Sequence, residues 1–299
     1  MRRVRLAFSD FVGLMLEPPH NVVLRALREA CEVTIVGMDE KPDLLVYSDF
    51  GESHWRFDGL KVYLTGENML PDFDQCDLAF TPADVPGDPR AVRLPYYAQT
   101  SLDLGRLVRP PGFDPSAELA RPGFCAFVVS NPRSPERNAF FRMLNRLRRV
   151  DSGGRHFNNM GGPVPDKMAF IRNYRFTLAF ENTCSPGYTT EKLVEPLLAG
   201  SIPIYWGNPD VSRDFDPGCM VNVSDFPDLE SAAEHMLALD ADREARLRLL
   251  RSPVFAGNTL PACATQGHVR EPILRLLDTG KPGKRVYRHR RLREHVYGS

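Results

Sequence analysis

The segment 176–208, FTLAFENTCSPGYTTEKLVEPLLAGSIPIYWGN, combines side chains that can hold a charged ligand rich in hydroxyl groups. An apolar stretch ends in Glu-Asn, a short loop with Pro and Gly follows, and Thr189 or Thr190 caps a helix. The N–H groups and the positive dipole end of such a helix bind anions, and Lys192 adds a full charge in the first turn. A diphosphate fits this place, and Glu191 could accept hydrogen bonds from the paired hydroxyls of a ribose. The alternative is that Glu191 is only a favourable first-turn acid and Lys192 a solvated side chain.

The first third of the chain has the pattern of a sheet with helical connections. One helical pattern spans 21–30, and short apolar runs with β-branched or aromatic residues predict strands at 4–8, 32–37, 43–48, 61–65 and 77–81. A Pro/Gly-rich passage at 109–124 then interrupts the pattern and is the candidate linker. The first part is therefore expected to be an α/β domain.

The same alternation restarts after the linker. Ser134 at the N-cap and Pro135 at the first helical position predict a helix start. The pattern predicts strands at 124–131, 175–182 and 201–207 and helices at 135–150, 166–174, 189–200 and 228–250, with a local bend at Pro196. We therefore expect an α/β fold with two Rossmann-like domains facing a cleft: 1–118, 119–280, and a basic tail, 281–299. Ligands of such sheets bind beyond the carboxyl ends of the strands, where Glu-Asn and Gly-Asn fall.

Composition limits the classes of partner. Lys and Arg number 38, as do Asp and Glu, so no overall charge favours nucleic acid as a partner.

The six cysteines include no C-x-x-C pair, which argues against a zinc site and indicates free thiols in a reducing compartment. Since no apolar run reaches 18 residues, we expect a cytoplasmic protein. Residues 281–299 hold seven Lys or Arg against one acid, so this tail could lie on an anionic membrane or pack on its own domain.

Three segments carry a resemblance to a known family. The segments 62–80 (VYLTGENMLPDFDQCDLAF), 127–144 (FVVSNPRSPERNAFFRML) and 176–215 resemble the α-1,3/4-fucosyltransferases, and the resemblance covers most of 60–225. It implies a two-domain glycosyltransferase of the GT-B type, with an N-terminal acceptor side and a C-terminal donor side. It also implies transfer of L-fucose from GDP-fucose, with inversion, to the 3-hydroxyl of N-acetylglucosamine in N-acetyllactosamine-type glycans, the class of the Lewis antigens. GDP-fucose is then a co-substrate, and no separate cofactor is expected.

The resemblance assigns roles to residues by motif. Glu67 in TGEN corresponds to the general base, and Arg137 in SPERNAF is expected at the diphosphate with Lys192. Around the nucleotide and the fucose the resemblance places Glu181, Asn182, Tyr188, Thr190 and Glu191. Without the resemblance, Glu67 could be a surface carboxylate beside a Pro turn. Arg137 could equally be one more solvent-facing helix charge, like Arg142, Arg146, Arg148 and Arg149.

The chemistry of the leaving group suggests a mechanism without metal. Charge that develops on departing GDP must be neutralised by a metal or by fixed cations, and the sequence has no Asp-x-Asp box. Arg137 and Lys192 offer the second route. The sequence therefore predicts no metal site.

Other candidates have equally good structural explanations. Asn158 could reach the nucleotide, but a Gly-rich connection also explains it. His54 and Trp55 could form an acceptor platform, or be an exposed imidazole and a packed aromatic. Two other functions stay open: a glycosyltransferase that uses another GDP-sugar, and a catalytically silent sugar-nucleotide-binding protein. The linkage, 1,3 or 1,4, also stays open.

Overall fold

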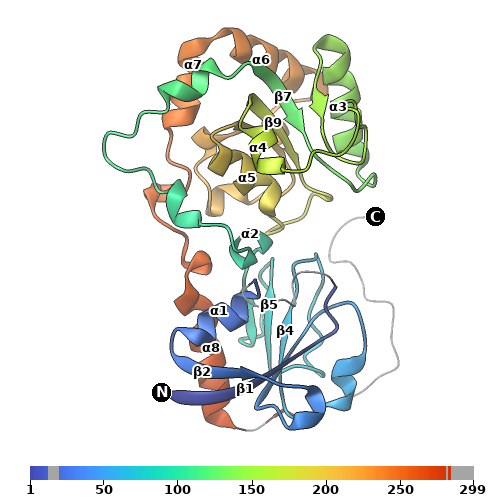
Figure 1. The fold of residues 1–299 in the computed structure, drawn as a ribbon, viewed down its shortest axis with the longest axis vertical. Coiled ribbons are helices and arrows are strands. Elements are labelled where there is room, and N and C mark those ends of the chain that lie inside the picture. Colours follow the sequence, from blue (N-terminus) through green and yellow to red (C-terminus); the bar gives the residue numbers. More distant parts are fainter. Residues whose placement is uncertain (13–19, 281, 284–299) are drawn as a thin grey trace. The chain divides into compact units, whose positions relative to one another are not determined.

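The computed structural model describes residues 1–12, 20–280 and 282–283, and the chain divides into two compact units (Figure 1). Unit 1 comprises residues 1–102 together with the chain from 262 onward, and unit 2 comprises residues 103–261. The predicted boundary at 118 is therefore wrong by about 16 residues, and residues 262–280 do not belong to the second domain. Except for residues 282 and 283, the predicted basic tail lies outside the described residues.

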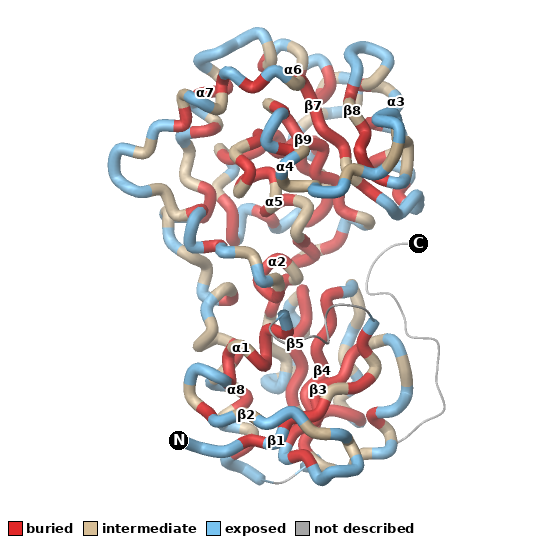
Figure 2. The backbone as a smooth tube through the Cα atoms, in the orientation of Figure 1, coloured by how far each residue is buried: buried red, intermediate tan, exposed pale blue. Residues whose placement is uncertain are grey.

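Unit 1 is built on a six-stranded parallel sheet with the order β2-β1-β3-β4-β5-β6. Its strands are β1 (Arg2–Ser9), β2 (Cys31–Ile35), β3 (Leu44–Tyr47), β4 (Leu60–Leu64), β5 (Leu78–Thr81) and β6 (Ala91–Arg93). The first five confirm the predicted strands. Every residue of β3, β4 and β5 is buried, as expected for central parallel strands covered on both faces (Figure 2). The helices of this unit are α1 (Val22–Arg28), α2 (Tyr96–Gln99) and α8 (Gln266–Thr279).

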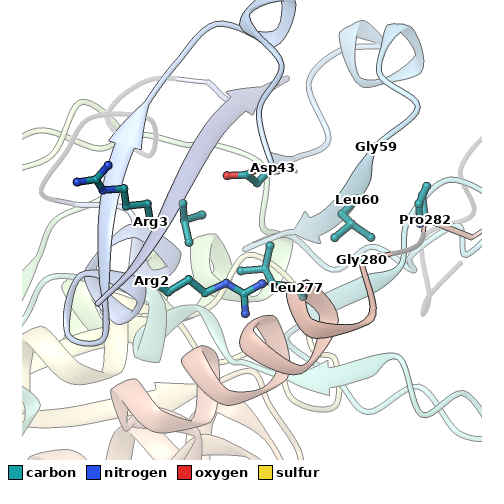
Figure 3. A pocket seen from close by; sticks show the side chains of 9 residues that line it. Arg2, Arg3, Asp43, Gly59, Leu60, Leu277, Gly280 and Pro282 are labelled. Atoms are coloured by element: carbon teal, nitrogen blue, oxygen red, sulfur yellow. Dashed lines mark hydrogen bonds between the residues drawn. The ribbon is translucent and has the colours of Figure 1, made fainter.

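Helix α8, although it follows unit 2 in the sequence, belongs to unit 1. It packs against α1, β4 and β5. Arg2, at the start of β1, donates to the Asp278 carboxylate (2.5 Å) and to the Leu277 carbonyl (2.9 Å). Figure 3 shows Arg2 reaching toward Leu277 beside a pocket of about 290 Å³. These contacts join the two ends of the unit, and local sequence pattern cannot reveal them.

Unit 2 contains a five-stranded parallel sheet with the order β11-β10-β9-β7-β8. Its strands are β7 (Gly123–Phe127), β8 (Asp151–Ser152), β9 (Tyr174–Phe180), β10 (Ile202–Trp206) and β11 (Val221–Asn222). Its helices are α3 (Pro135–Leu147), α4 (Lys167–Ile171), α5 (Glu191–Ala199), α6 (Leu229–Ala241) and α7 (Arg243–Arg251). The single helix predicted over 228–250 is wrong, because non-helical Asp242 ends α6 and caps α7 by accepting from the Ala245 N–H.

The two sheets share one order of strands. Numbered along the chain within each unit, both begin 2-1-3-4-5, the order of flavodoxin-like sheets, and confirm the predicted Rossmann-like fold class. The order reverses between β1 and β3 in unit 1 and between β7 and β9 in unit 2. Ligands of such folds bind beyond the carboxyl ends of the two strands that flank this point.

Aromatic packing fixes α3 on the sheet of unit 2. Phe140 on α3 contacts Phe180 at the end of β9, with ring centroids 5.0 Å apart. Phe141 stacks on Phe127 at the end of β7, with a centroid distance of 4.8 Å. The second turn of α3 is therefore held at the carboxyl ends of both strands that flank the switch point.

A buried carboxylate ties together the opposite edge of unit 2. Asp240, near the end of α6, accepts from Arg175 Nε (2.6 Å) and also pairs with Arg148 and Arg246. Burial opposes ionisation, but these arginines, Arg175 foremost, hold the pKa of Asp240 below its usual value.

No helix in the described parts of the chain is long and apolar enough to cross a membrane.

We expect Asp240→Asn to lower the free energy of unfolding by about 3 kcal/mol, because three guanidinium groups lose their shared acid. Urea denaturation measures this change. Asp242→Asn, two residues away, is the matched control and should change stability by less than about 0.5 kcal/mol, since Asn and Asp cap helices equally well. Equal losses in the two variants would contradict the assignment.

Candidate functional site

Arg137 lies in the first turn of α3, at the point where unit 2 is expected to bind a ligand. Ser134 occupies the N-cap and Pro135 begins the helix, as predicted, although the Ser134 hydroxyl does not cap it. The Arg137 side chain has no exposed surface. Its Nη1 donates to Asn182 Oδ1 (3.0 Å), and its Nη2 donates to the Asn131 carbonyl (2.5 Å).

The burial of Arg137 separates it from its neighbours on the same helix. Arg142 and Arg146 are exposed, so the interpretation of Arg137 as one more solvated charge is wrong. Burial lowers the pKa of Arg137, and Glu181 opposes this effect. Nε of Arg137 is buried without a hydrogen-bond partner. A guanidinium held only by neutral oxygens retains most of its capacity to attract an anion.

Glu181 follows β9 directly and binds the start of α5. Its carboxylate is fully buried and accepts from the Thr190 N–H (2.7 Å) and the Thr190 hydroxyl (2.6 Å). Thr190 is the predicted N-cap of α5, and its oxygen accepts in turn from the Lys192 N–H (3.3 Å). The chain's own groups therefore accept from the N–H groups of Thr190 and Lys192 at the start of α5. The anion site expected at this helix start stays a prediction.

Lys192 lies between two carboxylates. Its Nζ is 3.7 Å from Glu181 Oε2 and 3.4 Å from Glu191 Oε1, and it donates to the Thr190 hydroxyl oxygen (3.2 Å). Burial opposes the shift, but Glu181 and Glu191 raise the pKa of Lys192. Burial likewise opposes the shift of Glu191, whose pKa is held below its usual value by Lys192 and Lys167. The charge of Lys192 is thus largely balanced within the chain.

Asn208, after β10, fixes the loop between β9 and α5. Its buried side chain accepts from the Gly187 N–H (2.8 Å) and donates to the Thr189 hydroxyl (3.0 Å). Gly207 precedes it, and a Cβ there would lie 2.4 Å from Cγ of Glu181. Glycine is therefore required where β10 passes the buried carboxylate. The sequence indicated Asn208 only as part of a strand end, because its loop partners lie about 20 residues away.

The structure neither supports nor excludes a ligand contact for two further candidates, Tyr188 and Asn158. Tyr188 is buried in the same loop, at 4% exposure. Asn158 donates to the Gly154 carbonyl (2.7 Å) and accepts from the N–H groups of Met160 and Gly162. These bonds organise its own loop, so a contact between Asn158 and the nucleotide stays a prediction.

In unit 1, Glu67 lies just beyond the carboxyl end of β4, and its residue is exposed. Its backbone N–H donates to the Thr65 hydroxyl oxygen (3.0 Å). Gly66 between them lies against Tyr96, whose ring would be 2.2 Å from a Cβ at this position. The backbone that presents the Glu67 carboxylate is thus closely held.

The prediction that His54 contacts an acceptor, or is an ordinary exposed imidazole, is wrong. His54 is fully buried, stacks on Tyr47 and faces Asp10 Oδ2 (2.6 Å) and Gln75 Oε1 (2.8 Å) with its two ring nitrogens. In this structure the ring has no surface that a sugar could contact. Trp55 is half-buried and donates from its ring nitrogen to Gln75 (2.8 Å), so its part in an acceptor platform remains a prediction.

Within the described residues, no group of three or more His, Cys, Asp or Glu side chains is placed to hold a metal ion. That the reaction needs no metal stays a prediction. It requires that Arg137 and Lys192 neutralise the charge of the leaving group.

Two family models match most of the chain. The C-terminal model of glycosyltransferase family 10 (fucosyltransferase) matches residues 120–251, and the N-terminal domain model of the alpha-(1,3)-fucosyltransferase FucT matches residues 6–99. A crystal structure of an alpha1,3-fucosyltransferase with GDP-fucose is similar to this structure, with a TM-score of 0.78 and 26% identity, over 93% of this chain and 91% of that one.

Curated relatives agree. The chain is 35% identical to the alpha-(1,3)-fucosyltransferase FucT of Helicobacter pylori over 221 residues, which is 64% of this chain and 46% of the relative. It is 37% identical to the human alpha-(1,3)-fucosyltransferase 4 over 142 residues, or 44% of this chain and 26% of the relative. The matches span less than half the length of these relatives.

The titration of Glu181 provides a test of the site. Burial raises the pKa of Glu181 to about 7, against the opposing charge of Lys192. The folded protein therefore holds this proton more tightly than the unfolded chain, and the resulting stability is lost as the pH rises from about 4.5 to 7. We expect the stability of Glu181→Gln relative to the wild type to rise by up to about 3 kcal/mol over this range.

Urea denaturation at a series of pH values measures the difference. Glu191→Gln is a control of opposite sign, because the lowered pKa of Glu191 makes the wild type gain stability relative to that variant as the pH rises through the titration range. A Glu181→Gln curve that stays parallel to the wild type would show that Glu181 does not titrate near neutrality.

Proposed function

Because the chain belongs to glycosyltransferase family 10, the fucosyltransferases, we propose that it transfers L-fucose from GDP-fucose to a sugar hydroxyl, with inversion at the anomeric carbon. The observation that carries the proposal is the buried Arg137–Asn182 contact at the switch point between β7 and β9. It supplies a cation where a sheet of this order binds a nucleotide. The crystal structure similar to this chain over 93% of its length is of a protein with GDP-fucose.

On the donor side, Arg137 is the cation that we assign to the diphosphate. Lys192 is the second proposed cation, but Glu181 and Glu191 lie close to it and partly balance its charge. The diphosphate is therefore expected to interact more strongly with Arg137. Since Arg137 has no exposed surface and is bonded to Asn131 and Asn182, it meets the diphosphate only after these surroundings rearrange. Asn182, Tyr188, Thr190 and Glu191 complete the proposed surroundings of the nucleotide and the fucose.

The chemistry requires a base for the acceptor and a stabilised leaving group for the donor. Glu67 takes the proton of the acceptor hydroxyl as its oxygen attacks the anomeric carbon of fucose. The bond from that carbon to the diphosphate oxygen breaks, and its electron pair leaves with GDP. Because the acceptor oxygen attacks the face opposite the leaving group, the configuration inverts. Fixed cations then stabilise the charge on GDP without an essential metal.

For the acceptor, we propose the 3-hydroxyl of N-acetylglucosamine in N-acetyllactosamine-type glycans, on the strength of the α-1,3 relatives. We also propose that the enzyme acts in the cytoplasm. The basic segment 281–299 would then bring it to an anionic membrane surface that carries lipid-linked glycans.

The deciding experiment measures GDP release from GDP-fucose with and without N-acetyllactosamine in EDTA, followed by NMR of the product. Release that depends on the acceptor, with an α-1,3-fucosyl product, would support the donor, the linkage and metal independence together. Binding of GDP-fucose without turnover across a panel of acceptors would indicate a silent binding protein. Preference for GDP-mannose in a competition assay would indicate another GDP-sugar.

We expect Glu67→Gln to keep the Kd for GDP-fucose and to cut kcat at least about a hundredfold, the scale of losing a general base. Calorimetric titration and the GDP-release assay measure the two quantities. Glu52→Gln, at another exposed acid of unit 1, is the control and should leave both unchanged. Unchanged turnover in Glu67→Gln would remove Glu67 from the mechanism.

We expect Arg137→Lys to weaken GDP-fucose binding at least about tenfold, because an ammonium cannot reproduce the two contacts of the guanidinium with Asn182 and Asn131. Arg142→Lys, on the exposed face of the same helix, should bind as the wild type does. Isothermal titration with GDP-fucose makes the comparison. Equal affinities in the two variants would exclude Arg137 from the donor site.

A further inference from the structure

We propose that Asp49 is a positioning residue for the acceptor side of the reaction, and that it acts on Glu67 through the Thr65 hydroxyl. The inference rests on the proposed role of Glu67 as general base. It concerns unit 1 alone, and all the contacts that support it lie between residues 49 and 99.

Thr65, the residue directly after β4, is held at each of its polar atoms. Its N–H donates to the Phe80 carbonyl (3.2 Å), and its carbonyl accepts from Gln99 Nε2 (2.8 Å). Its hydroxyl donates to Asp49 and accepts from the Glu67 N–H (3.0 Å). Thr65 is also fully buried. It is therefore a fixed point from which the exposed Glu67 extends.

Asp49 determines the direction of these bonds. Its two carboxylate oxygens accept separately, one from the Tyr63 hydroxyl and the other from the Thr65 hydroxyl. The Asp49 carboxylate can only accept, and it lies closer to the Thr65 hydroxyl than the Glu67 carbonyl oxygen does (3.5 Å), so the single proton of that hydroxyl goes to Asp49. The lone pairs of that oxygen remain for the Glu67 N–H. The hydrogen bonds thus run from Glu67 to Thr65 to Asp49, and the last is assisted by charge.

A general base on a loop needs such a support. Loop residues move more than the strands they follow, and a misplacement of about 1 Å can cost about a hundredfold in rate. The Thr65 contact of Asp49 reaches the base, whereas the Tyr63 contact stays within the sheet, two residues earlier on β4. Loss of the Thr65 contact should therefore affect the position of Glu67, whereas loss of the Tyr63 contact should affect only the stability of the strand.

The test compares Thr65→Val, which keeps the shape and loses the hydroxyl, with Thr65→Ser, which keeps the hydroxyl. We expect Thr65→Val and Asp49→Ala each to lower kcat at least about tenfold, with the Kd for GDP-fucose within about twofold of the wild type. Thr65→Ser should restore kcat to within about threefold. The double variant should lose little beyond the worse single one, because both changes break the same contact.

Tyr63→Phe is the matched control. It removes the bond from the Tyr63 hydroxyl to Asp49, so it should lower the melting temperature without lowering kcat more than about threefold. Hydrogen exchange supplies a readout independent of turnover: the Glu67 amide should exchange faster in Thr65→Val and Asp49→Ala, and as in the wild type in Tyr63→Phe.

Wild-type kcat in Thr65→Val, or an equal loss of kcat in Tyr63→Phe, would overturn the proposal. Active Glu67→Gln would instead refute the base assignment. In that case the exchange of the Glu67 amide still decides whether Asp49 and Thr65 hold this segment: faster exchange in both variants supports it, and unchanged exchange refutes it.

Discussion

The start of α5 in unit 2 depends on one buried carboxylate, Glu181. It links the end of β9 to the start of α5 through two hydrogen bonds to Thr190. An isolated carboxylate in the interior is costly, and the raised pKa of Glu181, about 7, reflects that cost. Its surroundings are shaped to accommodate it: Gly207 leaves room for it, and Lys192 supplies an opposing charge. Strongly perturbed groups of this kind cluster at functional sites.

Parallel sheets explain why local pattern predicted so much of the fold. Buried strands such as β4 and β9 are continuous apolar runs, and Ser134 with Pro135 marks a helix start whose signal lies in adjacent residues. Gly200 ends α5 in the left-handed conformation, which glycine adopts readily after a helix. The fold class, most strands and the backbone elements of the candidate site in unit 2 were therefore predictable.

What the sequence could not give depends on partners far away in the chain. Helix α8 joins unit 1 through contacts with residues more than 200 positions earlier. His54 looks like an exposed imidazole until Asp10 and Gln75 are brought to it. The helical pattern over 228–250 runs through Asp242, where capping breaks it. Strand β6 has three residues, too few for a pattern. The burial of Arg137 likewise appears only when Asn182 is placed beside it.

The two units place their functional residues by the same local arrangement. In unit 1 the Thr65 hydroxyl donates to Asp49 and accepts from the N–H of Glu67; in unit 2 the Thr190 hydroxyl donates to Glu181 and accepts from the N–H of Lys192. In both, a carboxylate takes the only proton of a threonine, and the residue two positions later bonds to the free lone pair. The arrangement fixes the backbone of a residue with a charged side chain just beyond a strand, as at Glu67, or at the start of a helix, as at Lys192. The two arrangements differ in the charged residue: Glu67 is exposed, whereas the Lys192 side chain lies against the carboxylates of Glu181 and Glu191. Exposure suits the role proposed for Glu67, because a general base must reach its acceptor. The pairing of Lys192 with its own carboxylates instead makes Arg137 the stronger candidate for the diphosphate.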